Sequence, residues 1–217
     1  MNYLFFDIEC CDGIHICSFG FVVVDKNFNI IKKSDVIINP EKAFKLGKAG
    51  EESKLTLSYP QETFLKQKNF SHFYEYIKSL LLENVVFGHS VKSDVGFVNI
   101  ACARYRLKRL KYTAYDTQKM YKELKGDKDI KSLGKIVSEL QINVKKLEFH
   151  KSCDDAEFTM NVAKKICEIN NCSLDDLIVK YKDCSVRSDK LKKKKKHKHK
   201  KFFKLFRQKQ REKLNKN

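Results

Sequence analysis

The spacing of hydrophobic and polar positions changes from strand-like to helix-like along this chain. An apolar run from Tyr3 to Ile8 is followed by two β-rich runs, residues 15–25 and 30–39, which are joined by the turn sequence DKNFN. We expect these three segments to form an antiparallel unit. Residues 40–60 contain both prolines and show little periodicity, so they predict a long loop with one helical turn.

Beyond residue 70 the pattern alternates between helical and strand-like segments. The spacing of Phe73, Ile77 and Leu80 predicts a helix from Ser71 with one apolar face, and a short buried strand ending at Gly88 follows it. The remaining pattern predicts a helix from about residue 94, a strand at 112–115, and helices at 117–125, 131–140, 152–169 and 173–181. Strands that alternate with helices after an antiparallel start are typical of an α/β fold, a mixed β-sheet flanked by α-helices.

Length and composition narrow the class of protein. A chain of 217 residues with 42% hydrophobic residues can bury one good core, so we expect a single globular domain. The eight cysteines lack the paired spacing of zinc sites, so we expect them to be reduced and mostly buried, with a structural zinc site as the alternative. No apolar run is long enough to span a bilayer and no secretory signal is recognisable, so we expect a cytoplasmic protein without a transmembrane segment.

The net charge of +18 is concentrated at the C-terminus. Residues 187–217 contain sixteen lysines and arginines against Asp189 and Glu212. We therefore divide the chain into a folded domain, residues 1–183, and a Lys-rich basic tail, residues 184–217, that is disordered or partly helical. The tail suits a polyanion such as DNA or RNA, but a solvated extension explains it equally well. The sequence FFKLF at 202–206 also fits docking to an acidic membrane or a protein groove.

Acidic residues recur where this architecture brings chain segments together. Asp7 and Glu9 project from the same face of the first strand, and two buried like charges are tolerated best around a divalent metal ion. Asp94 opens a helix after a strand, Asp155 lies in the first turn of another helix, and His150 precedes it. Each has a simpler explanation: carboxylates at a strand end facing water, a favourable helix-dipole interaction, a capping pair with Ser152, or an exposed loop histidine.

The order and spacing of these residues resemble a known family. Asp7-x-Glu9, Asp94 within GHSVKSDVGFV, and His150 five residues before Asp155 resemble the three motifs of the DEDDh 3'-5' exonucleases. These form the DnaQ-like branch of the ribonuclease H-like superfamily, and the resemblance spans roughly residues 3–165.

Three positions depart from the family pattern. Cys10 stands where the family often has Thr, and Ser90 and Ser93 stand where Asn and an aromatic residue are common. These positions concern nucleotide preference more than metal binding.

The resemblance implies a ribonuclease H-like mixed β-sheet flanked by α-helices and a metal-dependent exonuclease that releases 5'-mononucleotides from single-stranded DNA or RNA. Two ions, Mg²⁺ or Mn²⁺, would be held by Asp7, Glu9, Asp94 and Asp155, with His150 as the general base. Glu9 would also contact the terminal 3'-hydroxyl. Ile8 and Phe97 are candidates to flank the terminal base, although a core position suits each of them as well.

Two other functions fit the same residues. One is a non-catalytic nucleic-acid- or ribosome-binding protein that keeps the fold, and the other is a proofreading subunit that docks on a polymerase through FFKLF. A degenerate member would have lost a carboxylate or the histidine. All five residues are present, which favours the enzyme.

Overall fold

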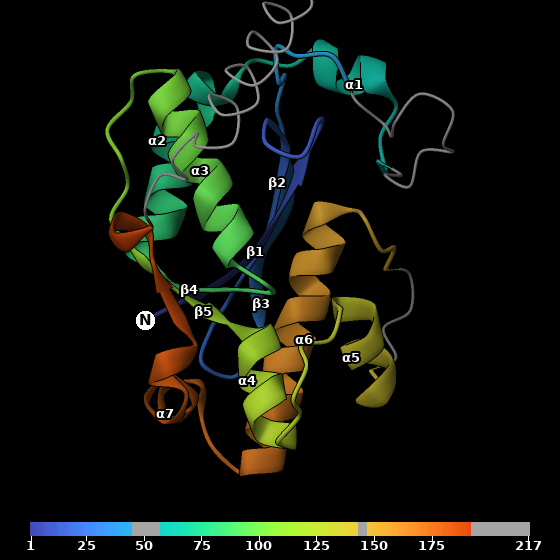
Figure 1. Cartoon of the computed structure of the whole chain (residues 1–217), viewed down its shortest axis with the longest axis vertical. Coiled ribbons are helices and arrows are strands. Elements are labelled where there is room, and N and C mark those ends of the chain that lie inside the picture. The colour runs from blue at the N-terminus through green and yellow to red at the C-terminus, as the bar shows by residue number, and fades with distance from the viewer. Residues whose placement is uncertain (45–56, 143–146, 192–217) are drawn as a thin grey trace, which may run out of the picture.

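The computed structural model describes residues 1–44, 57–142 and 147–191, and its centre is one six-stranded mixed sheet (Figure 1). The strand order is β3-β2-β1-β4-β5-β6. The antiparallel unit comprises β1 (Tyr3–Cys10), β2 (Ile16–Val24) and β3 (Ile30–Ile37). Next to it, β4 (Val85–Gly88) and β5 (Thr113–Asp116) run parallel to β1, and β6 (Ser185–Arg187) is antiparallel to β5. The predicted α/β fold and antiparallel start are confirmed.

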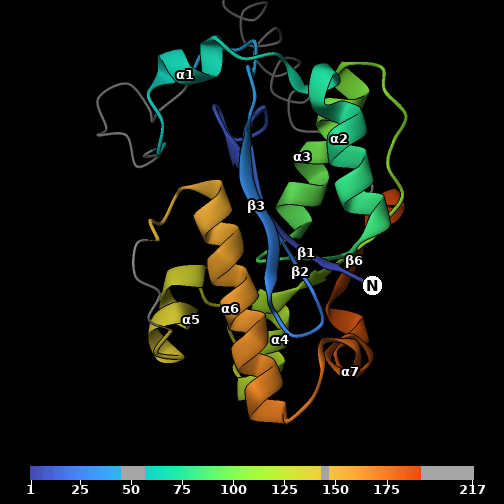
Figure 2. The same ribbon diagram turned by 180° about the vertical axis from the view of Figure 1, so that it is seen from behind.

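Helices cover both faces of the sheet (Figures 1 and 2). One face packs against α2 (Phe70–Glu83) and α3 (Lys92–Arg104). The other packs against α4 (Thr117–Lys125), α5 (Leu133–Glu139), α6 (Ser152–Asn170) and α7 (Leu174–Lys180), while the short α1 (Gln61–Leu65) lies apart from both groups. The longest helix, α6, contacts both β1 and β2.

The alternation of side chains along β1 decides which way its carboxylates point. Leu4, Phe6 and Ile8 lie in the apolar cluster beneath α2 and α3, whereas Tyr3 and Phe5 lie in the cluster formed with α6. Because successive side chains of a strand face opposite sides, Asp7 and Glu9 continue the face that is turned toward α6.

The sheet extends further along the chain than the sequence pattern indicates. The predicted boundary between residues 183 and 184 falls just before β6, whose three residues pair with β5. Ser188 continues this packing, because its backbone N–H donates to the Tyr112 carbonyl oxygen at 3.0 Å. Residues 184–191 therefore pack with the folded domain, and the rest of the predicted tail, 192–217, lies outside the described residues.

The connection between β3 and α2 also differs in detail from its prediction. Its helix, α1, begins only after Pro60, and residues 45–56 lie outside the described residues.

All eight cysteines are free thiols, and seven of them are buried while Cys172 is half-buried. Within the part of the chain that the structure describes, no helix is long and apolar enough to cross a membrane.

Candidate active site

The predicted site residues come from four separate segments that meet beside β1. Asp7 and Glu9 lie near the carboxyl end of β1, and Asp94 lies in the first turn of α3. Asp155 lies in the first turn of α6, and His150 lies in the loop that precedes this helix. Figure 1 shows β1 running between α3 and α6, the two helices that carry the other carboxylates.

Side-chain distances bring three of these residues together, and electrostatic repulsion links the other two to them. Ligand atoms of Glu9, His150 and Asp155 lie within 4.8 Å of one another. Burial, and then repulsion from Asp94, Asp155 and Glu9, raises the pKa of Asp7 well above its usual range. The four carboxylates therefore act on one another as a single group of negative charges.

The other three carboxylates are perturbed in the same direction. Burial and repulsion from Asp155 raise the pKa of Glu9 to about 7. Burial raises the pKa of Asp155 to about 6, although the His150 backbone N–H and side chain oppose this shift. Burial, followed by repulsion from Asp116 and Glu9, also raises the pKa of Asp94.

The donor set of this cluster suits divalent cations. Among the described residues, no lysine or arginine forms an ion pair with any of the four carboxylates. Asp94 and Asp155 are buried and Asp7 and Glu9 are half-buried. Four such carboxylates without a cationic partner offer oxygen ligands and uncompensated negative charge, which hard ions such as Mg²⁺ and Mn²⁺ neutralise. The residues present therefore fit a site for these ions.

His150 is held by its backbone while its side chain remains exposed. Its N–H donates to Asp155 Oδ2 at 2.9 Å, and its carbonyl oxygen accepts from the Ser58 hydroxyl at 2.7 Å. Its φ of 69° lies in the left-handed region, which is unfavourable for a residue with a side chain. These contacts fix His150 next to Asp155 with its imidazole open to solvent.

The adjacent acidic residue, Asp154, has a different environment from Asp155. Lys33 Nζ on β3 lies 2.5 Å from Asp154 Oδ1 and 2.7 Å from Glu157 Oε2. Asp154 is 2% exposed, and its hydrogen bond with Lys33 opposes the effect of burial so that its pKa is lowered. Only the second residue of the pair, Asp155, belongs to the carboxylate cluster.

A second hydrogen-bond network anchors the start of α6. The Asp35 carboxylate on β3 accepts hydrogen bonds from the Ser152 hydroxyl, the Cys153 N–H and the Tyr59 hydroxyl, each at 2.7 Å. Ser152 also bonds to the Ser18 hydroxyl on β2. These bonds hold the first turn of α6, and therefore Asp155, against β2 and β3.

Gly20 on β2 makes this close approach possible. It pairs with Asp7 across the two strands. A Cβ atom at Gly20 would lie 2.0 Å from the Ser152 carbonyl carbon and 2.1 Å from the Cys153 nitrogen. The backbone of α6 thus passes directly over a strand position where only glycine fits, one strand away from Asp7.

The two residues proposed to flank a terminal base have different degrees of burial. Ile8 is 6% exposed and packs in the cluster beneath α2 and α3. Phe97 on α3 is partly buried against the same cluster. Both are part of this core, and Phe97 is the more accessible of the two.

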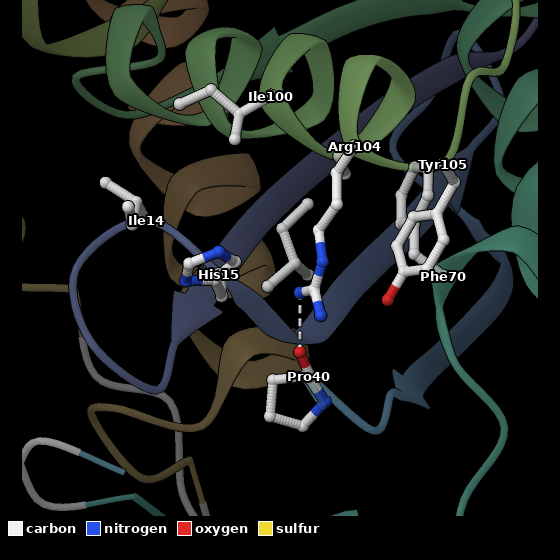
Figure 3. Close-up of a pocket in the computed structure, with 9 residues that line it drawn as sticks. Ile14, His15, Pro40, Phe70, Ile100, Arg104 and Tyr105 are labelled. Carbon is white, nitrogen blue, oxygen red and sulfur yellow. Dashed lines mark hydrogen bonds between the residues drawn. The ribbon is translucent and has the colours of Figure 1, made fainter. Parts of the chain in front are cut away.

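A separate pocket lies between the β1–β2 loop and the C-terminal end of α3 (Figure 3). Arg104 extends from α3 toward Pro40, whose carbonyl oxygen accepts its hydrogen bond at 2.6 Å, and His15 lies nearby on the loop. None of the predicted site residues lines this pocket. Arg104 therefore ties the segment after β3 to the C-terminal end of α3.

The anchoring residues were missed by the sequence analysis. Asp35 and Ser152 are 117 positions apart, and no local pattern indicates their contact. The only signal was a carboxylate within a β-rich run, which an exposed strand face explains as well. Asp116 was also missed. It is the N-cap residue of α4, and its repulsion of Asp94 on α3 depends on two elements that are separated in the sequence.

The sheet is mixed and has helices on both faces, and β1, α3 and α6 together form an acidic cluster. These features define a ribonuclease H-like fold. A family model described as "DNA polymerase III subunit epsilon-like, C-terminal domain" (DEDDh_C) matches residues 22–166. The chain belongs to the DEDDh, or DnaQ-like, family of 3'-5' exonucleases. The matched range begins after Asp7 and Glu9. The first motif, on β1, is therefore evidence separate from the match to the family model.

Solved structures show the same fold at low sequence identity. A 3'-exonuclease that recognises the 3' end of the histone mRNA stem-loop has a TM-score of 0.63 and 15% identity, with 79% of this chain and 64% of that chain covered. The nuclease domain of 3'hExo, a DEDDh family member bound to rAMP, has a TM-score of 0.63 and 15% identity, with coverage of 79% and 93%. E. coli exonuclease I in complex with a dA16 oligonucleotide has a TM-score of 0.60 and 16% identity, with coverage of 82% and 42%.

The protein thus spans less than two thirds of the first and third of these structures. No curated protein matches it in sequence.

Proposed function

We propose that this protein is a metal-dependent 3'-5' exonuclease that releases 5'-mononucleotides from single-stranded DNA or RNA ends. The observation that supports this proposal best is the convergence of Asp7, Glu9, Asp94, Asp155 and His150 from separate segments into one acidic cluster. The similar solved structures include a 3'-exonuclease that recognises the histone mRNA stem-loop, a nuclease domain bound to rAMP and an exonuclease in complex with a DNA oligonucleotide. Both DNA and RNA therefore stay within the proposal.

The four carboxylates would hold two divalent ions between them. When bound, such ions lower the pKa of a coordinated water and stabilise negative charge on a phosphodiester. The carboxylates would supply the oxygen ligands, and because burial and repulsion raise their pKa values, a nearby positive charge would favour their ionised forms.

His150 would accept the proton of the attacking water. An imidazole suits this role near neutral pH, and its ring lies within 4.8 Å of ligand atoms of Glu9 and Asp155. Because the side chain is exposed, it can pass the proton on to solvent. The backbone contacts of His150 keep the ring at this position, and Glu9 would also contact the terminal 3'-hydroxyl.

The adjacent residues Asp154 and Asp155 provide a matched test. We expect Asp155→Asn to reduce cleavage of 5'-labelled single-stranded DNA and RNA by at least about 10²-fold, because it removes a ligand from the cluster. We expect Asp154→Asn to keep the one-nucleotide ladder and to lower the free energy of unfolding by about 1–3 kcal/mol, because it weakens the bond to Lys33.

Gel analysis of the products with Mg²⁺, Mn²⁺ or EDTA, and urea unfolding of each variant, measure both effects. If wild-type protein binds the oligonucleotides but cleaves neither, the exonuclease proposal is wrong and a binding protein takes its place. Equal activity of the two variants would show that the acidic cluster is not the catalytic centre.

The raised pKa values also predict a pH-dependent response to metal. Glu9 and Asp155 have folded-state pKa values of about 7 and about 6, above the ordinary values of 4.5 and 3.8. The folded state therefore holds more protons than the unfolded state over this window, so the metal-free protein loses stability as pH rises from about 4 to about 7.

Divalent metal should reverse this loss where the carboxylates are ionised. We expect Mn²⁺ to raise the melting temperature more at pH 8 than at pH 5, relative to EDTA at matched ionic strength. Differential scanning fluorimetry measures the shift. An equal or larger shift at pH 5 would contradict the assignment of these carboxylates as the ligands.

A further inference from the structure

The connection between α3 and β5 presents basic side chains on one side only. In residues 106–112, Leu110 and Tyr112 are 3% and 9% exposed and Leu107 is partly buried, whereas Arg106, Lys108, Arg109 and Lys111 are exposed. Since the apolar positions are packed into the core, the basic positions between them face solvent. The segment contains no acidic residue.

Hydrogen bonds hold this connection in place although it is neither helix nor strand. The Leu107 N–H donates to the Cys102 carbonyl oxygen at 2.8 Å, and the Tyr74 hydroxyl on α2 donates to the Lys108 carbonyl oxygen at 2.7 Å. At its other end, the Tyr112 N–H donates to the Ser188 hydroxyl at 2.9 Å. The basic side chains therefore project from a fixed backbone.

The last described residues lie directly beside this connection. The Arg109 guanidinium donates to the Leu191 carbonyl oxygen at 3.1 Å and to the Ser188 carbonyl oxygen, while its Nε donates to Asn99 Oδ1 on α3 at 3.1 Å. Figures 1 and 2 both show the red end of the described chain beside α2 and α3. This segment adds two more exposed basic residues, Arg187 and Lys190.

We call the six exposed basic residues the α3–β5 basic surface: Arg106, Lys108, Arg109, Lys111, Arg187 and Lys190. Within residues 1–44, 57–142 and 147–191, only Arg187 of these six forms an ion pair, with Asp189 at 2.9 Å. Just before this connection, Arg104 at the end of α3 forms an ion pair with Glu41 at 3.4 Å. The positive charge of this surface is thus largely uncompensated by the folded domain.

The start of this surface, at Arg106, lies just beyond the C-terminal end of α3, whereas Asp94 lies in the first turn of that helix. At 1.5 Å per residue, α3 separates Arg104 from Asp94 by about 15 Å along its axis. A stacked strand advances about 3.4 Å per nucleotide, so a nucleic acid held at Asp94 would need to be longer than about four nucleotides to reach Arg106.

We propose that the α3–β5 basic surface binds the phosphate backbone of nucleic acid several nucleotides away from the cleaved bond. This inference rests on the proposed function, because it assigns the binding of a longer substrate to a surface separate from the catalytic cluster. Lysine and arginine contacts to phosphate are independent of base sequence and depend strongly on salt. They would hold DNA and RNA alike while the 3' end is cleaved.

A charge-matched pair of variants tests this surface in the full chain. The first variant is Lys108→Gln/Lys111→Gln/Lys190→Gln. The control is Lys26→Gln/Lys128→Gln/Lys164→Gln, which removes three exposed lysines from other parts of the domain. Both variants lose the same net charge.

We expect the surface variant to bind a single strand of about 20 nucleotides more weakly. The slope of log K against log salt should decrease by about 2, since each lost phosphate contact contributes about 0.7. Cleavage of a trinucleotide should stay at the wild-type rate, and cleavage of the long strand at subsaturating concentration should decrease by about tenfold or more. The control should retain the wild-type slope.

Fluorescence anisotropy in EDTA measures binding without cleavage and therefore separates the two proposals. An unchanged slope for the surface variant, or an equal decrease for both variants, overturns the inference whether or not the protein is a nuclease. Loss of binding to phosphatidylserine vesicles with unchanged oligonucleotide binding also overturns it, in favour of a membrane surface. Failure of wild-type protein to cleave either substrate refutes the proposed function and leaves the binding result to stand alone.

Discussion

Replacing Asp7 with asparagine is expected to reduce metal-dependent cleavage by about 10³-fold or more while leaving the protein folded. Asp7 is the carboxylate whose pKa is raised by repulsion from all three of the others. Asparagine removes both the negative charge and a carboxylate oxygen that would serve as a metal ligand. Metal ions contribute several kcal/mol to such reactions, and each 1.36 kcal/mol corresponds to about tenfold in rate.

The same substitution should stabilise the metal-free protein. At pH 8 the folded state carries buried carboxylates whose pKa values are raised, and asparagine removes one of these charges without changing the size of the side chain. We expect a higher melting temperature in EDTA than for wild type, and a smaller increase on adding Mn²⁺. Single-turnover cleavage and differential scanning fluorimetry test the two effects together.

A lower melting temperature for Asp7→Asn in EDTA would contradict this account. Loss of activity would then follow from damage to the fold, and the repulsion between carboxylates would not be the main effect of the wild-type residue. Wild-type activity in Asp7→Asn would instead exclude the cluster as the catalytic site.

The local features of the site could be predicted from the sequence. The two-residue spacing of Asp7 and Glu9 in an apolar strand requires them to share a face, and the structure turns that face toward α6. The positions of Asp94 and Asp155 in first helical turns follow from the apolar periodicity behind them. Each of these inferences depends on residues within one element.

Features that depend on two distant segments could not be predicted in this way. The three residues of β6 are too few to show a period of two, and their partner strand lies about seventy positions earlier. In the sequence, Asp35 is one charged position in a β-rich run. Its role as a hydrogen-bond acceptor depends on Ser152, which belongs to another element. These contacts depend on which distant segments pair and in which register, and a single sequence does not reveal that pairing.

Gly20 illustrates this limit and provides the second large expected effect. In a strand pattern a glycine is usually a weak position, because it has no side chain to pack. Here a methyl group at this position would lie 2.0 Å from the backbone of Ser152, which is anchored by Asp35 and Ser18. Either α6 must move away from β2 or β2 must bend.

We therefore expect Gly20→Ala to lower the free energy of unfolding by about 2–4 kcal/mol and to reduce cleavage far more than this instability explains. Overpacking accounts for about 1–3 kcal/mol, and broken hydrogen bonds at the start of α6 add to it. Displacement of that first turn moves Asp155 and the His150 loop relative to Asp7. A misplacement of about 1 Å in a catalytic group reduces rates by about 10²-fold.

Gly96→Ala is the matched control, because a Cβ at Gly96 in α3 meets nothing within 4 Å. Alanine is a better helix former than glycine by about 1 kcal/mol, so this variant should be slightly more stable than wild type. Urea unfolding gives both free energies, and cleavage under conditions where each variant is fully folded gives the rates.

If Gly20→Ala folds as stably as Gly96→Ala, α6 does not pack directly against β2 at Gly20. If Gly20→Ala is destabilised but cleaves normally when folded, the contact stabilises the fold without positioning Asp155. Loss of both stability and rate is the result that links the glycine on β2 to the geometry of the acidic cluster.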